Sequence, residues 1–104
     1  LVVGVSWIGL MKCQMRRARV RFNDYLFGMT DGGAMTLDRM LRMVDRLPAG
    51  VTEFCCHPAS CRCPEIDATM PRYGHEEELR ALTDVRLARA LHSAGIKTIA
   101  FGGL

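Results

Sequence analysis

Hydrophobic residues recur at helical spacing in residues 36–47. Five apolar side chains share one face of that helix: Leu37, Met40, Leu41, Val44 and Leu47. Thr36 is a favoured N-cap residue, and Asp38 lies in the first turn, where the helix dipole favours an acidic side chain. Pro48 and Gly50 end the segment. The pattern predicts an amphipathic helix whose apolar stripe faces a core.

A β-rich, mostly apolar run, residues 51–56, follows this helix and leads into His57. Such a run predicts a strand that is buried on both faces of a parallel sheet. Glu53 interrupts the run, so we expect it to face a polar site or to point to solvent from an edge strand, because burying a lone charge is costly. Active sites of α/β proteins form at the C-terminal ends of such strands. His57 is therefore the candidate catalytic residue, and a structural histidine is the alternative.

The rest of the chain continues the alternation of helices and strands. Residues 60–74 contain prolines and a glycine without periodicity, which predicts a long loop. Residues 75–82, with acids in the first turn, and residues 85–94 predict two helices, with Gly95 just past the end of the second. Residues 96–101 predict a final strand. The order indicates an α/β fold with parallel strands, and so few strands suggest part of a larger domain.

The N-terminal segment, residues 1–22, is predicted as a separate arm or partial helix. Residues 1–11 are apolar, and either a helix or a buried strand and turn fits them. Five basic residues follow: Lys12, Arg16, Arg17, Arg19 and Arg21. They form either a solvated helix face or connecting arm, or a patch for anionic lipid headgroups. No aromatic residues are interleaved for stacking, so we expect no nucleic-acid partner.

The composition and the first residues of the chain indicate the cellular compartment in which we expect the protein. The chain has 104 residues and a net charge of +3, which suits one small domain and does not by itself argue for nucleic acid. Residues 1–10 lack the pattern of a secretory signal, and their apolar run is shorter than the roughly 20 residues that span a bilayer. We therefore expect a cytoplasmic protein with free thiols, with contact to the inner membrane surface left open.

Cysteines gather around the candidate histidine. Four of the five lie, with His57, between positions 55 and 63: Cys55, Cys56, Cys61 and Cys63. Thiolates and imidazole are zinc ligands, so a small zinc-binding interaction module is the alternative function. The spacing argues against zinc, because adjacent residues of a strand point to opposite faces and the second pair is C-x-C rather than C-x-x-C.

Four segments, taken in order, resemble the C-terminal portion of YdjC-like carbohydrate deacetylases, closest to the hopanoid biosynthesis-associated branch. They are residues 21–28 (RFNDYLFG), 50–59 (GVTEFCCHPA), 73–83 (YGHEEELRALT) and 94–104 (AGIKTIAFGGL). The resemblance implies that residues 23–104 are the C-terminal part of an irregular TIM-like β/α barrel. It also implies a divalent metal, Mg²⁺ or Zn²⁺, that activates water to attack an N-acetyl carbonyl. The implied substrate is an N-acetylated sugar or glycolipid, such as an N-acetylglucosaminyl hopanoid.

Three residues of this sequence carry over from that family. His57 matches an active-site histidine that protonates the leaving amine or stabilises the oxyanion. Asp24 and Glu53 match supporting polar residues, and Glu77–Glu78 match a pattern that we interpret as structural. The family's metal ligands belong to an N-terminal half that this sequence does not match. We therefore expect no metal ligand here and no activity from the chain alone, and we leave homo-oligomerisation open.

Overall fold

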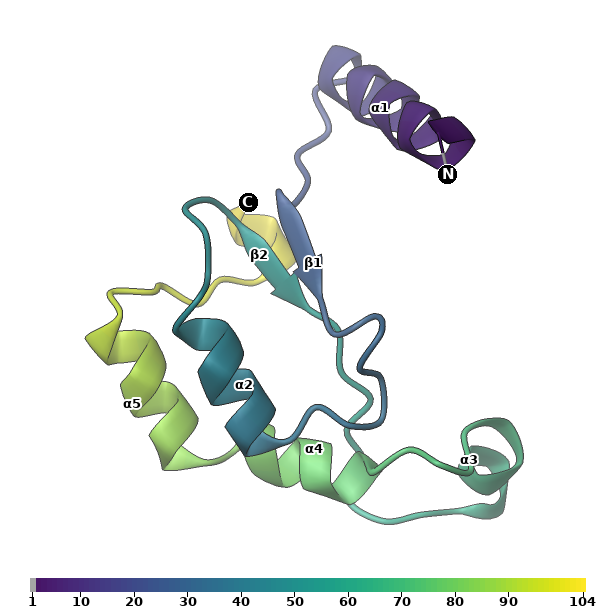
Figure 1. Cartoon of the computed structure of the whole chain (residues 1–104), viewed down its shortest axis with the longest axis vertical. Helices are drawn as coiled ribbons and strands as arrows, with labels where there is room; N and C mark the ends of the chain where they lie inside the picture. The colour runs from purple at the N-terminus through teal and green to yellow at the C-terminus, as the bar shows by residue number, and fades with distance from the viewer. Residues whose placement is uncertain (1) are drawn as a thin grey trace.

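A two-stranded parallel sheet lies between a group of helices and a separate N-terminal helix (Figure 1). The computed structural model describes residues 2–104, and their side chains from Trp7 onward. The elements are α1 (Val2–Arg17), β1 (Tyr25–Phe27), α2 (Leu37–Val44), β2 (Thr52–Phe54), α3 (Pro64–Thr69), α4 (His75–Leu82), α5 (Val85–Ser93) and the 3₁₀ turn η1 (Phe101–Gly103). The predicted α/β class with parallel strands is confirmed, and the barrel stays a prediction.

The sheet joins two segments that lie far apart in the sequence. β1 pairs with β2 in parallel, with Tyr25 opposite Thr52 and Phe27 opposite Phe54. The rings of Phe27 and Phe54 lie 6.1 Å apart between centroids. β2 is half-buried along its whole length, so the expectation of burial on both faces is wrong for the described chain. A two-stranded sheet leaves both strands at an edge, which explains the exposure.

The core lies where α2 packs against α4 and α5. Its buried residues are Met35, Met40, Val44, Ala81 and Leu87. Thr36 caps α2 as predicted, since its hydroxyl accepts a hydrogen bond from the backbone N–H of Arg39. α4 has the predicted bounds, and α5 begins after Asp84, whose carboxylate accepts from the backbone N–H of Arg86. α2 and α5 follow the local sequence because a side-chain N-cap and an apolar stripe predict the same helix in each case.

Two predictions about the C-terminal half are wrong. The expected loop at residues 60–74 contains helix α3, which begins with Pro64 at a position where proline's missing N–H costs nothing. The expected strand at residues 96–101 is absent: residues 96–100 have no regular secondary structure, and η1 begins at Phe101. A strand needs a hydrogen-bonded neighbour, and within residues 2–104 the only ladder is the one between β1 and β2.

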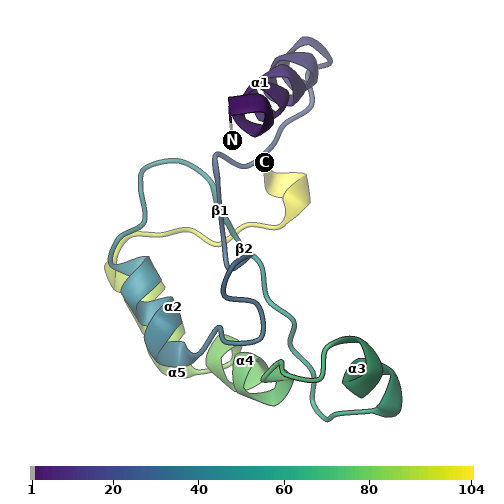
Figure 2. The same ribbon diagram turned by 45° about the vertical axis from the view of Figure 1, so that its right-hand side comes forward.

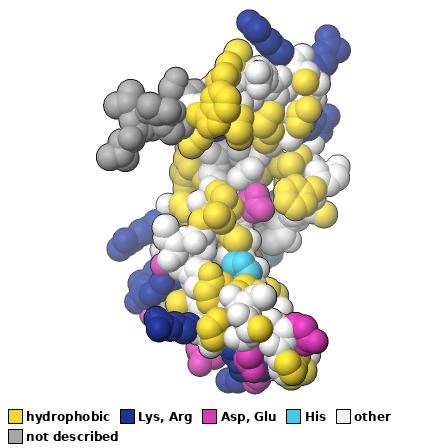
Figure 3. Space-filling view, turned by 90° about the vertical axis from the view of Figure 1, so that its right-hand side faces the viewer, with side chains coloured by type: hydrophobic (Ala, Val, Ile, Leu, Met, Phe, Trp, Pro, Cys, Tyr) yellow, Lys and Arg dark blue, Asp and Glu magenta, His cyan; other side chains and the backbone are white. Residues whose placement is uncertain are grey.

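The N-terminal segment is a helix, as the first of its two interpretations has it. α1 stands apart from the other elements in both ribbon views (Figures 1 and 2). Several of its large apolar side chains are exposed: Trp7, Ile8, Leu10 and Met11. Hydrophobic and basic side chains share its visible surface (Figure 3). Across residues 2–104, no helix combines the length and apolar character that crossing a membrane requires.

Candidate functional site

His57 follows the C-terminal end of β2, where the sequence placed the candidate catalytic residue. Both polar groups of its backbone are bound by side chains of α4. The N–H of His57 donates to Oε2 of Glu78 at 2.6 Å. Its carbonyl oxygen accepts from Nδ1 of His75 at 2.5 Å. Two side chains from the first turn of α4 therefore bind the backbone N–H and the backbone C=O of His57.

Glu78 is the most deeply buried charged group of the site. Its side chain is 0% exposed. Besides His57, it accepts a hydrogen bond from the backbone N–H of Met35, 3.1 Å from Oε1. A carboxylate has four lone-pair positions and no proton to donate, so two N–H donors suit it and offset part of the cost of burial. Glu78 thereby joins the residues before α2 to the end of β2.

His75 is 2% exposed, and its hydrogen bond defines its tautomer. A carbonyl oxygen only accepts, so Nδ1 of His75 carries the hydrogen and a neutral ring has its lone pair on Nε2. That Nε2 is buried and has no hydrogen-bond partner within the described residues. Nδ1 of His57 is buried without a partner in the same part of the chain. Each of the two imidazoles therefore keeps one buried ring nitrogen without a partner among the described residues.

Tyr73 packs between the two histidines. Its ring meets the His57 ring edge-on at 5.1 Å between centroids and lies 5.7 Å from the His75 ring. The tyrosine ring rests on Gly33, where an added Cβ would lie 2.4 Å from Cγ of Tyr73. Only a residue without a side chain permits this approach. The backbone at Gly33 also accepts a hydrogen bond from Gly74 at 2.7 Å, which fixes the start of α4.

His75 and Glu78 are parts of the site that the sequence alone did not indicate. Acids at the start of a helix are usually exposed partners of the helix dipole, and Glu76 and Glu77 are exposed in this way. His75, Glu78 and Ala81 are the buried residues of α4, at a spacing of three. The sequence shows only that a histidine, a glutamate and an alanine recur every three residues on one side of the helix, and burial of that side is a finding of the structure.

The two supporting residues lie away from the histidine cluster. Asp24 stands before β1, at the opposite end of the strands from His57, and its Oδ2 accepts from the backbone N–H of Val51 at 2.8 Å. Its geometry is that of a local connection between the two strand starts. Glu53 lies half-buried in the middle of β2, opposite Leu26. The supporting roles of Asp24 and Glu53 stay predictions.

The cysteines are free thiols, as expected. Burial, followed by the negative charges of Glu78 and Cys55, raises the pKa of Cys56 from 9.0 to about 11. Cys63 is the N-cap residue of α3 and lies outside β2 and the residues that directly follow it. Within the described part of the chain, no three His, Cys, Asp or Glu side chains converge to hold a metal ion. The zinc-module alternative therefore lacks a ligand set in these residues.

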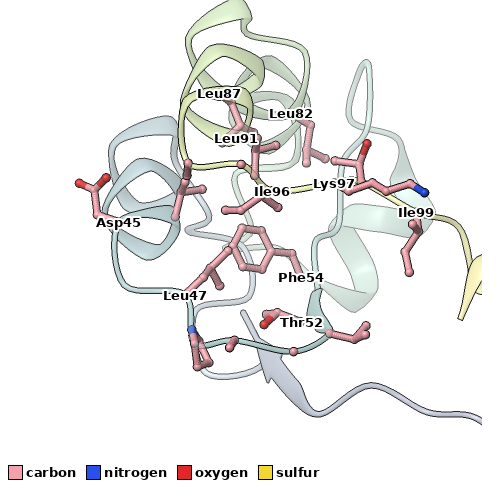
Figure 4. A pocket seen from close by; sticks show the side chains of 18 residues that line it. Asp45, Leu47, Thr52, Phe54, Leu82, Leu87, Leu91, Ile96, Lys97 and Ile99 are labelled. Atoms are coloured by element: carbon pink, nitrogen blue, oxygen red, sulfur yellow. The ribbon is translucent and has the colours of Figure 1, made fainter.

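A large apolar cavity of about 970 Å³ lies between β2, α5 and the C-terminal segment (Figure 4). The side chains that point toward it come from the connection after α2, from β2, from α5 and from the C-terminal segment: Leu47, Phe54, Leu87, Leu91 and Ile96 (Figure 4). Thr52 also lines it, and its buried Oγ1 has no partner in the described residues. His57 is not part of its wall. The cavity is thus separate from the histidine cluster.

Comparison with known proteins shows the family to which the chain belongs. The YdjC-like protein family matches residues 3–93, which include His57, Tyr73, His75 and Glu78. The chain belongs to the YdjC-like family. A carbohydrate deacetylase from Geobacillus stearothermophilus is 32% identical over 79 residues, which are 75% of this chain and 32% of that relative. This YdjC-like chain therefore spans about a third of the length of the curated relative that it matches. No solved structure matches it significantly.

Proposed function

We propose that this YdjC-like protein is part of a carbohydrate N-deacetylase, closest to the C-terminal part of its barrel, and that His57 belongs to the active site. The observation that carries the proposal is the position of His57. It lies three residues beyond the end of the parallel strand β2, its backbone is held at both polar atoms, and it lies within the span matched by the family. The resemblance of residues 50–59 and 73–83 to the deacetylases supports the same assignment.

The reaction is hydrolysis of an amide. Water adds to the carbonyl carbon of the N-acetyl group, the C–N bond breaks, and acetate and a free amine leave. The nitrogen needs a proton as it departs, and a protonated imidazole at His57 can deliver one from a ring nitrogen. Alternatively the same imidazolium can stabilise the oxyanion by donating a hydrogen bond. Both roles require the ring to be aimed at the reacting atoms within a fraction of an ångström.

The family resemblance also implies a divalent metal, Mg²⁺ or Zn²⁺, which activates water in such hydrolases. The described residues do not fit a metal site by themselves, because no three potential ligands converge. We therefore assign the metal ligands to another part of the deacetylase. The residues of this chain hold His57, and they contribute the proton donor or the oxyanion donor.

A hybrid enzyme tests the proposal. The segment of the Geobacillus deacetylase that aligns with this chain is replaced by the matching residues of this chain, and acetate release from an N-acetylglucosaminyl glycoside is measured. We expect acetate release from the hybrid, its loss in His57→Ala and its retention in the control His92→Ala, which alters an exposed histidine of α5. A folded hybrid that is inactive, or one that is indifferent to His57→Ala, would refute the assignment. The chain alone is expected to release no acetate.

The substrate class that we propose is a lipid-linked N-acetylglucosamine, such as a hopanoid glycolipid, met at the cytoplasmic surface of the inner membrane. α1 supports it, because Trp7 is 66% exposed and the basic residues that follow have no acidic residue among them. A basic side chain near an anionic surface contributes about 1 kcal/mol, so each arginine removed should weaken vesicle binding about fivefold. Co-sedimentation of Arg16→Gln and Arg17→Gln with anionic vesicles, against the control Arg42→Gln on α2, measures this. Equal binding to neutral vesicles would contradict the proposal.

A further inference from the structure

The backbone of His57 is held by an arrangement that ordinary secondary structure does not provide. Buried backbone N–H and C=O groups outside a strand ladder need partners from other backbone groups, side chains or water. Here the N–H of His57 bonds to Oε2 of Glu78, and its C=O bonds to Nδ1 of His75. The two partners are three residues apart on α4, so they share its inner face and both point at one peptide segment.

We propose that His75 and Glu78 are positioning residues that aim the imidazole of His57 by fixing its backbone. The inference rests on the proposed role of His57 and adds two residues to it. Neither residue needs to touch substrate. Each acts through hydrogen bonds to His57, much as the groups that orient metal-bound or catalytic histidines do.

Glu78 contributes more than a single hydrogen bond. Its buried carboxylate also accepts from Met35, so it ties the site to the residues that precede α2 in the core. An amide in its place has only one oxygen. Glu78→Gln therefore keeps one of the two N–H bonds and presents an NH₂ group to the other donor. The peptide at His57 or the backbone at Met35 loses its partner, and the end of β2 should shift.

His75 and Tyr73 restrict the remaining freedom. The Nδ1–H of His75 fixes the carbonyl of His57, while the edge contact with Tyr73 limits where the His57 ring can turn. Asparagine can imitate the first function, because its side-chain nitrogen occupies nearly the place of imidazole Nδ1 and donates a hydrogen bond. His75→Asn should therefore preserve the position of His57, whereas His75→Ala should not.

Nuclear magnetic resonance on the chain as it exists tests the arrangement without any activity. We expect the imidazole ¹H–¹⁵N correlations of His75 to show the Nδ1–H tautomer. We also expect the backbone amide and ring signals of His57 to move in Glu78→Gln and in His75→Ala. They should stay in place in His75→Asn and in Glu77→Gln, which changes the exposed neighbour on the same turn. Unmoved His57 signals in folded Glu78→Gln and His75→Ala would overturn the inference.

The hybrid deacetylase gives the functional measurement. Misplacing a catalytic group typically costs on the order of 10- to 100-fold in rate. We expect His75→Ala to lower kcat by that factor with KM within about twofold, and His75→Asn to recover most of the loss. Equal losses in both variants, or losses that only follow the melting temperature, would show a merely structural role and overturn the inference. An inactive parent hybrid would count against the proposed function alone, because the resonance test would still decide the positioning.

Discussion

Replacing Gly33 by alanine should destabilise the chain more than any other glycine-to-alanine change compared below. Gly33 has φ +82°, a left-handed conformation that costs a residue with a Cβ about 1–2 kcal/mol. The new Cβ would also lie 2.4 Å from Cγ and 2.7 Å from Cα of Tyr73. Because one of these atoms is backbone, the clash cannot be relieved by turning the tyrosine ring. Overpacking of this kind adds about 1–3 kcal/mol, so the total loss should be about 2–5 kcal/mol.

Two other glycines separate the conformational cost from the clash. Gly95 has φ +69° and nothing within 4 Å of an added Cβ, so Gly95→Ala should lose only the conformational part, about 1–2 kcal/mol. Gly9 lies within α1 with the same open space and no positive φ. Gly9→Ala should not destabilise the core, and it should increase the helix content of α1, because alanine is the better helix former by about 0.5–1 kcal/mol.

Urea unfolding followed by far-ultraviolet circular dichroism measures all three variants. Tryptophan fluorescence is unsuitable, since the single tryptophan, Trp7, is exposed on α1 and does not report on the core. The His57 ring signals should move in Gly33→Ala and not in Gly95→Ala, because Tyr73 packs on His57. If Gly33→Ala and Gly95→Ala lose the same free energy of unfolding within about 0.5 kcal/mol, the close packing of Tyr73 on Gly33 is refuted.

Three further predictions concern the core and two ionisable groups. Met40 is fully buried, so Met40→Ala should lower the free energy of unfolding by about 2–5 kcal/mol, whereas Met29→Ala at an exposed site should change it by less than about 0.5 kcal/mol in the same urea titration. Hydrogen bonds from the side chain and backbone N–H of Arg86 lower the pKa of Asp84 from 3.8 to about 2. The stability that Asp84 contributes as the N-cap of α5 should be complete above pH 3.8 and should disappear as the pH falls through about 2. Circular dichroism should show this as a loss of helix at low pH. The Asp84→Asn variant should not show this pH-dependent loss, because asparagine does not titrate. Because the pKa of Cys56 is raised to about 11, this thiol should stay unalkylated at pH 9 while exposed thiols react with iodoacetamide, and its stabilising effect should decline as the pH rises from 9 through about 11.

The sequence by itself determined the helices that carry the core. Thr36 and Asp84 are N-caps, and the stripe through Met40 and Val44 is buried, because capping and periodicity act within a few residues of each other. Sequence also placed His57 after a strand. These features depend on local backbone geometry, which the neighbouring residues largely fix.

Only the tertiary structure decided which strands pair and what surrounds His57. The segment at residues 96–101 has strand-like residues but no ladder partner in the described chain, while the three-residue β1 becomes a strand because β2 lies beside it. Pairing joins residues distant in sequence, so no local pattern specifies it. Likewise Glu78 in isolation resembles any acidic residue at a helix start. Packing of α4 against the end of β2 turns it into the buried acceptor that holds the backbone of His57.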